Sequence, residues 1–161
     1  LYNFEKLSGY KFSADIVKKL VKTFPNNIIG CKDSSYNLFE NLKLPNFLMF
    51  PGSEAKLLKG LELGCSGCIS AVTNVTHVLS RKVFDDFENK SSQTANDKLI
   101  EVRETFDNYN LISALHSYLS VKDKEFENLL PPLILLSQDK KKELITKLDN
   151  LKFRAEKNLA A

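Results

Sequence analysis

Lys32 is the residue in this sequence best placed for covalent chemistry. It directly follows the apolar run Ile28–Cys31, and such a run between helical segments is typical of a buried parallel strand. Active sites of α/β folds lie at the carboxyl ends of such strands. A lysine shielded from water there can present a neutral amine, which attacks a carbonyl carbon and forms a Schiff base. The alternative is a structural lysine that is solvated at the strand end or paired with Asp33.

Three successive predicted strands end in small or polar side chains. The residues are Ser34 and Ser35 after the first strand, Gly52, Ser53 and Glu54 after the second, and Ile69, Ser70 and Ala71 near the end of the third. Because parallel strands of one sheet end at the same edge, we expect these groups to surround one mouth together with Lys32. Ser35 and Ser53 also stand just before helical patterns, so helix capping is the alternative interpretation of both.

The elements that would position these residues alternate short apolar runs with amphipathic stretches. The predicted strands are 27–31, 47–50 and 68–72. A predicted helix at 14–24 precedes the first strand, and predicted helices at 38–42, 57–61 and 75–87 follow the three strands in turn. This alternation predicts a parallel sheet with right-handed crossovers, either an open doubly wound sheet or an α/β barrel. The glycine motifs that bind dinucleotides or nucleotide phosphates do not occur. Later patterns are helical only, which predicts two domains, 1–90 with the strands and 91–161 as a helical extension.

Charge and hydropathy argue against two classes of partner. The 161 residues include 23 Lys+Arg and 20 Asp+Glu, so the formal net charge is only +3 and does not indicate a nucleic-acid partner. In the main basic cluster, Lys140–Lys142, the neighbours Asp139 and Glu143 favour a solvated helix face. No apolar run approaches the roughly 20 residues of a membrane helix, and the start lacks a signal-peptide pattern. We therefore expect a cytoplasmic protein without a membrane partner.

The three cysteines could be redox-active, metal-binding or structural. Cys65 and Cys68 have the spacing of a redox pair or of half a zinc site, but Cys31 is far away in sequence and no histidine pair supplies further ligands. Gly64 and Gly67 each directly precede one of these two cysteines and allow close packing. We expect free thiols buried as small apolar side chains, and no metal.

Several segments, in order across nearly the whole chain, resemble the dihydrodipicolinate synthase/N-acetylneuraminate lyase family. They are Leu1–Asn3, Leu7–Gly9, Ile28–Ser35, Phe50–Glu54, Gly64–Ala71 with Asn74, and Pro131–Leu133. The resemblance implies a (β/α)8 TIM barrel, here only its second half from the end of strand 5 through strand 8, plus a C-terminal helical extension. A complete barrel takes roughly 250 residues, which fits a chain that holds about half of one.

The family's functional residues transfer position by position. Lys32 matches the Schiff-base lysine. The residues that match substrate-binding positions are Ser34, Gly52, Glu54, Ile69 and Ala71. Tyr2 matches a tyrosine of strand 5 that is not assigned the proton relay, and the proton-relay tyrosine and the carboxylate-binding loop are expected upstream of Leu1.

The resemblance implies a Schiff-base-forming class I lyase or aldolase that needs no cofactor and is usually a homotetramer. Its substrates would be pyruvate or another 2-oxo acid and an aldehyde, as in dihydrodipicolinate synthase, 2-keto-3-deoxy sugar acid aldolases or N-acetylneuraminate lyase. The alternative is a non-catalytic barrel relative with a binding or assembly role. Because the sequence begins with Leu1 rather than Met, we expect a piece of a longer protein that is inactive alone.

Overall fold

The computed structural model describes residues 1–156 of the chain, which form two compact units. The first unit comprises Leu1–Ser70 and Val83–Gln93, and the second comprises Ala71–Lys82 and the chain from Thr94 onward. The domain boundary expected after residue 90 stays a prediction. Within residues 1–156, no helix combines the length and the apolar character that a membrane span requires.

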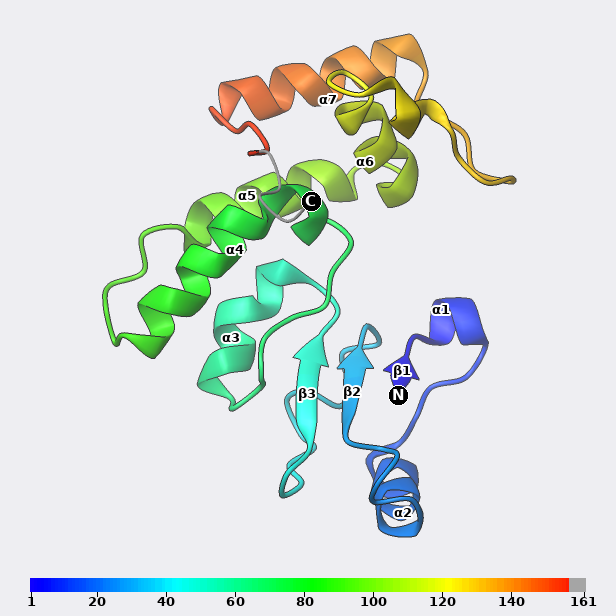
Figure 1. Ribbon diagram of the computed structural model, residues 1–161, viewed down its shortest axis with the longest axis vertical. Coiled ribbons are helices and arrows are strands. Elements are labelled where there is room, and N and C mark those ends of the chain that lie inside the picture. The colour runs from blue at the N-terminus through cyan, green and yellow to red at the C-terminus, as the bar shows by residue number, and fades with distance from the viewer. Residues whose placement is uncertain (157–161) are drawn as a thin grey trace. The chain divides into compact units, whose positions relative to one another are not determined.

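A three-stranded parallel sheet organises the first unit. Its strands are β1 (Tyr2–Asn3), β2 (Gly30–Asp33) and β3 (Leu48–Pro51), and their order in the sheet is β1-β2-β3. Their arrowheads point to the same edge in Figure 1, and we call this edge, where Asn3, Asp33 and Pro51 lie, the carboxyl edge. The predicted α/β arrangement with parallel strands is therefore confirmed, with a partial sheet.

The two faces of this sheet differ in burial. Cys31 and Met49 pair in register and are buried on one face. The core on that face also includes Val17, Leu38, Phe39, Leu42 and Cys65. The opposite face carries Lys32 and Phe50, which are half-buried. The expectation of buried cysteines is confirmed for Cys31 and Cys65, whereas Cys68 is only partly buried.

The helix α2 (Ala14–Thr23) follows the short α1 (Glu5–Ser8) and confirms the predicted start. The hydroxyl of Ser13 accepts a hydrogen bond from the N–H of Ile16, as an N-cap does. After β3, the 3₁₀-helix η1 (Glu54–Lys56) leads directly into α3 (Leu57–Glu62). This order places η1 at the carboxyl edge.

The predicted helix 38–42 is wrong. The N–H groups of Asn41 and Leu42 both bond to the carbonyl of Leu38, which closes a single turn, and the N–H groups of Leu38 and Phe39 donate to the Asp33 carboxylate instead. Little chain is left before Pro45, so a helix nucleus has no room to propagate. The apolar spacing was nevertheless informative, because Leu38, Phe39 and Leu42 are buried.

The predicted strand 68–72, which would be the last barrel strand, is also not formed. The N–H of Ser66 bonds to the carbonyl of Met49, and the N–H of Ile69 bonds to that of Pro51. Between these two hydrogen bonds the chain advances by three residues on this segment but by only two on β3. The extra residue breaks the regular pairing of a parallel ladder, as a β-bulge does. Gly67 lies inside the bulge with a φ of 142°, a conformation that favours glycine.

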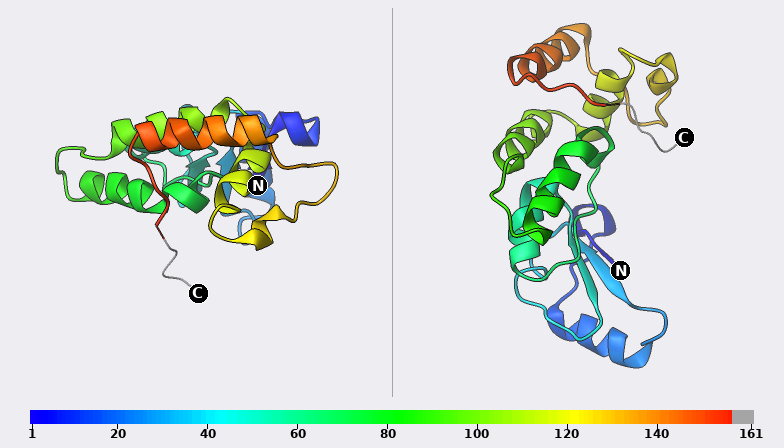
Figure 2. Two further views of the ribbon diagram at one scale, coloured as in Figure 1. Left: turned by 90° about the horizontal axis from the view of Figure 1, so that it is seen from above. Right: turned by 60° about the vertical axis from the view of Figure 1, so that its left-hand side comes forward.

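The second unit is helical, as expected for the end of the chain. It contains α5 (Asn96–Asp107), α6 (Leu111–Leu119), the 3₁₀-helix η2 (Lys124–Glu127) and α7 (Gln138–Asn150), while α4 (Thr73–Glu88) contributes its first part. Helix α7 packs against α5 and α6 (Figure 2). The Ser137 hydroxyl caps its start by accepting from the N–H of Lys140. The buried core residues include Val102, Phe106, Leu115, Leu144 and Leu148.

Burial of Cys31 makes the stability of the first unit pH-dependent. Desolvation raises the pKa of this thiol from 9.0 to about 11. Between these values the thiol of the unfolded chain ionises while the folded thiol stays protonated, so folding stability present below pH 9 is lost as the pH rises. We expect the free energy of unfolding to fall by about 2 kcal/mol more in the wild type than in Cys31→Ala between about pH 8 and about pH 10.5. Denaturant titrations measure this difference, and identical pH profiles would contradict it.

Candidate active site

Lys32 lies one residue before the end of β2, with its side chain on the less buried face of the sheet. The register pairs it with Tyr2 on β1 and with Phe50 on β3. Its Nζ lies 4.4 Å from the centroid of the Tyr2 ring, a distance suited to a cation–π interaction. In the part of the chain that the structure describes, no carboxylate pairs with this ammonium group.

The interpretation of Lys32 as the partner of Asp33 is wrong. Adjacent residues of a strand point to opposite faces, and Asp33 is completely buried on the other one. Its Oδ1 accepts from the Asn3 amide at 2.7 Å and from the N–H of Tyr36 at 3.0 Å. Its Oδ2 accepts from the N–H groups of Leu38 and Phe39. The carboxylate therefore organises the loop after Lys32 and leaves the amine free for chemistry.

Asp33→Ala is expected to lower the free energy of unfolding by about 3 kcal/mol, because it leaves four buried or partly buried donors without their acceptor. The matched control is Asp15→Ala in α2, since the Asp15 side chain is 93% exposed and pairs with Lys18. That change should cost at most about 0.5 kcal/mol. Equal losses in the two variants, measured by denaturant unfolding, would contradict the structural role of Asp33.

Ser34 and Gly52 bring the loops after β2 and β3 into contact. A Cβ atom on Gly52 would lie 2.8 Å from the Cβ and 2.9 Å from the Cα of Ser34, closer than packed atoms allow. The N–H of Gly52 also donates to the carbonyl of Asp33 at 2.9 Å. A glycine is therefore required for this approach, and the Ser34 hydroxyl lies at the carboxyl edge two residues beyond Lys32.

Glu54 is completely buried behind this edge. Its Oε2 accepts a hydrogen bond of 2.5 Å from the Ser70 hydroxyl, which ties η1 to the segment after α3. The N–H of Ile69 donates to the carbonyl of Pro51 at 3.2 Å, and the side chain of Ile69 is 46% exposed. Glu54 and Ile69 are thus brought to the end of β3. Ala71 belongs to the second unit, and its role at the mouth stays a prediction.

The interpretation that Ser35 and Ser53 cap the helical patterns they precede is wrong for both serines. The Ser35 hydroxyl accepts from the N–H of Glu5 at 3.0 Å, so it caps the start of α1 rather than a helix of its own loop. Ser53 precedes η1, but its hydroxyl makes no capping hydrogen bond. Both serines lie at the carboxyl edge because they follow β2 and β3 directly.

Tyr2 is the site residue that the sequence analysis assigned no role. Its ring contacts the amine of Lys32, so a phenol lies beside the candidate nucleophile within the described chain. The expectation that the proton-relay tyrosine lies upstream of Leu1 stays a prediction. The contact arises because β1 and β2, about thirty residues apart in sequence, pair with Tyr2 opposite Lys32. Sequence spacing alone does not reveal this pairing.

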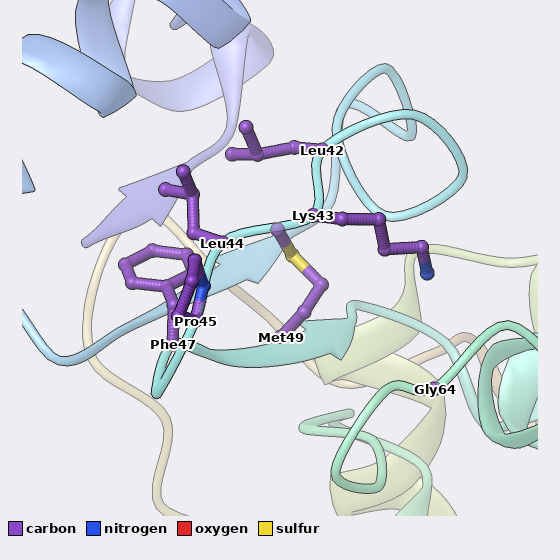
Figure 3. A pocket seen from close by; sticks show the side chains of 7 residues that line it. All are labelled: Leu42, Lys43, Leu44, Pro45, Phe47, Met49 and Gly64. Atoms are coloured by element: carbon purple, nitrogen blue, oxygen red, sulfur yellow. The ribbon is translucent and has the colours of Figure 1, made fainter.

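A cavity of about 340 Å³ in the first unit lies away from these residues (Figure 3). It is lined by Leu42, Lys43, Leu44, Pro45, Phe47, Met49 and Gly64. None of the predicted site residues lines it, so we do not assign the chemistry to this cavity. Among residues 1–156, no group of three or more His, Cys, Asp or Glu side chains could hold a metal ion.

Comparison with known proteins shows the family to which this chain belongs. The profile of the dihydrodipicolinate synthetase family matches residues 1–151. The chain belongs to this family. A 4-hydroxy-tetrahydrodipicolinate synthase of Hydrogenobaculum is 35% identical over 79 residues, which are 47% of this chain and 27% of that protein. An uncharacterized DapA-like lyase of Chloroflexus aurantiacus is 28% identical over 146 residues, 86% of this chain and 48% of its own.

Solved structures of the dihydrodipicolinate synthase family share the fold. Dihydrodipicolinate synthase from Agrobacterium tumefaciens gives a TM-score of 0.77 at 22% identity, with 93% of this chain and 52% of that chain covered. YagE from E. coli, solved in complex with pyruvate, also gives 0.77 at 24% identity and covers 96% and 56%. These structural neighbours are TIM barrels, and this chain spans about half the length of each.

Proposed function

We propose that this chain is the second half of a TIM-barrel lyase that forms a Schiff base between Lys32 and pyruvate or another 2-oxo acid. The observation that carries the proposal is the Lys32 amine at the carboxyl edge of a parallel sheet, against the Tyr2 ring and without a carboxylate partner in the described chain. Membership of the dihydrodipicolinate synthetase family and the pyruvate complex of YagE support the choice of substrate.

In the proposed reaction, the neutral Nζ of Lys32 attacks the keto carbon of pyruvate, and loss of water leaves an iminium ion. The positive nitrogen draws electrons from the neighbouring methyl group, which loses a proton and becomes a nucleophilic enamine carbon. This carbon attacks the carbonyl of an aldehyde and forms the new carbon–carbon bond. Water then hydrolyses the iminium ion, which releases the product and restores Lys32, and the reverse sequence cleaves the bond.

The neighbouring residues have distinct proposed roles. Tyr2 is positioned to move protons at the amine through its hydroxyl, and the Ser34 hydroxyl would bind an oxygen of the substrate. Gly52 permits the approach of the two loops that form this edge. Glu54 and Ile69 would shape the mouth on the β3 side. The homotetramer, the cytoplasmic location and the identity of the aldehyde stay predictions.

Reductive trapping tests the proposal in the complete natural protein. Incubation with pyruvate and sodium borohydride should add one pyruvate-derived group per chain, seen by intact mass spectrometry, because borohydride reduces the imine to a stable secondary amine. Lactate, which has no keto group, should add nothing under the same conditions. A folded protein that pyruvate leaves unmodified would refute the Schiff-base mechanism.

A further inference from the structure

The cavity of about 340 Å³ in the first unit lies on the face of the sheet opposite to Lys32. Met49 lines it, and this residue is 5% exposed and pairs in register with the buried Cys31. Adjacent residues of a strand point to opposite faces, so Met49 points away from the face that carries Phe50 and Lys32. The cavity is therefore separate from the candidate active site.

A tight turn before β3 forms the apolar side of the cavity. The ring of Pro45 fixes its own φ, and Asn46 has a φ of 55°, in the left-handed region that asparagine occupies more readily than most residues. The turn brings the side chains of Leu44, Pro45 and Phe47 together on one side of the cavity (Figure 3). This side offers a surface for a hydrocarbon group.

Lys43 is the only charged residue among the described residues that line the cavity. Its side chain extends on the side of Gly64, away from the apolar turn (Figure 3), and its Nζ donates to the carbonyl of Leu63. An ammonium group has three N–H donors, so two are left for a ligand. Within the described chain no carboxylate pairs with Lys43, and the nearby Glu40 pairs with Lys59 at 2.6 Å.

The charge of Lys43 acts on the protein interior beside the cavity. Burial raises the pKa of the Cys65 thiol, whereas the positive charge of Lys43 lowers it. Cys65 follows the lining residue Gly64 and belongs to the same core as Met49. Where protein displaces water, a charge attracts an opposite charge more strongly than it does in bulk water.

The size and the lining of the cavity indicate the class of ligand. Pockets for small molecules span about 300 to 1,000 Å³ and are mostly apolar, with a few polar groups that orient the ligand. One ammonium group matches one negative charge, and its two remaining N–H donors match the two oxygens of a carboxylate. A phosphate dianion would lack donors for its third oxygen, and an amine would be repelled.

We propose that this cavity is a binding site for a small apolar monocarboxylate. Its hydrocarbon body would contact Leu44, Phe47 and Met49, and its carboxylate would bind the ammonium group of Lys43. The proposal does not depend on the chemistry proposed for Lys32, because the two lysines serve different faces of the sheet.

NMR titration of the complete natural protein with phenylacetate and with hexanoate tests the site. Phenylacetamide and hexanamide keep the same apolar bodies without the charge, and phenethylamine reverses the charge. At least one carboxylate should bind at one site per chain, at least about tenfold more tightly than its amide. Phenethylamine should bind no better than the amides.

Two substitutions of Lys43 test the role of its charge. Lys43→Gln keeps a donor for the carbonyl of Leu63 but removes the charge, and it should weaken carboxylate binding about tenfold. Lys43→Arg keeps the charge and should bind the carboxylate within about threefold of the wild type. Leu44→Ser reduces the apolar contact and should weaken binding at least about threefold.

Two further lysines serve as matched controls. Lys22→Gln, on the exposed side of α2, and Lys32→Gln, on the other face of the sheet, should both bind the carboxylate as the wild type does. The proposal is overturned if neither carboxylate binds, if acid and amide bind equally, or if Lys43→Gln binds like the wild type. A loss of binding in Lys32→Gln instead would place the ligand at the carboxyl edge and would equally overturn it.

Discussion

Lys32→Arg is expected to lower kcat for pyruvate-dependent carbon–carbon bond formation or cleavage by at least about 10³-fold. Arginine keeps the positive charge and the contact with the Tyr2 ring, but its guanidinium stays protonated and cannot attack a carbonyl carbon. Steady-state kinetics on the complete natural protein measure the loss. Because charge and size are nearly preserved, a large effect reports the missing nucleophile rather than a disrupted fold.

Lys22→Arg is the matched control for this substitution. Lys22 is exposed in the last turn of α2, which leads to the start of β2 and not to its carboxyl end. The same chemical change should leave kcat and KM as in the wild type. An active Lys32→Arg enzyme would show that Lys32 does not form the Schiff base. Equal losses of kcat in both variants would show that the loss does not report the nucleophile.

Tyr2→Phe is expected to lower kcat about 10²-fold while leaving imine formation with pyruvate detectable. The substitution keeps the ring that lies 4.4 Å from Lys32 and removes only the hydroxyl that would move protons. The expected signature is therefore slow turnover with continued borohydride trapping. Tyr10→Phe is the control, because Tyr10 is 50% exposed and packs against Phe12 rather than against the lysine. An unchanged kcat in Tyr2→Phe would assign proton transfer to another group.

The sequence predicted those features of the fold that depend on residues close to one another along the chain. Ser13 and Ser137 cap helices α2 and α7, a local signal because an N-cap bonds to a backbone N–H only three residues away. Lys32 was located from the apolar run before it, since the end of a strand fixes the position of the next residue. The parallel arrangement followed from the alternation of strands and helices.

The failures share a dependence on contacts between distant segments. The region 38–42 has helical spacing, but Asp33 takes the N–H groups of Leu38 and Phe39 and holds a single turn. The bulge at Gly67 depends on hydrogen bonds to β3, and the contact of Tyr2 with Lys32 depends on the register of β1 with β2. Propensity and periodicity contain no information on such pairings.

The most direct test of the central claim is to identify the lysine that carries the reduced pyruvate adduct. The complete natural protein is treated with pyruvate and borohydride and digested, and its peptides are mapped by mass spectrometry. The proposed mechanism predicts a single modified lysine, Lys32, and no adduct in Lys32→Arg, whereas Lys22→Arg is modified like the wild type. An adduct on a different lysine, or equal labelling of several lysines, would contradict the mechanism and favour a barrel relative with a binding or assembly role.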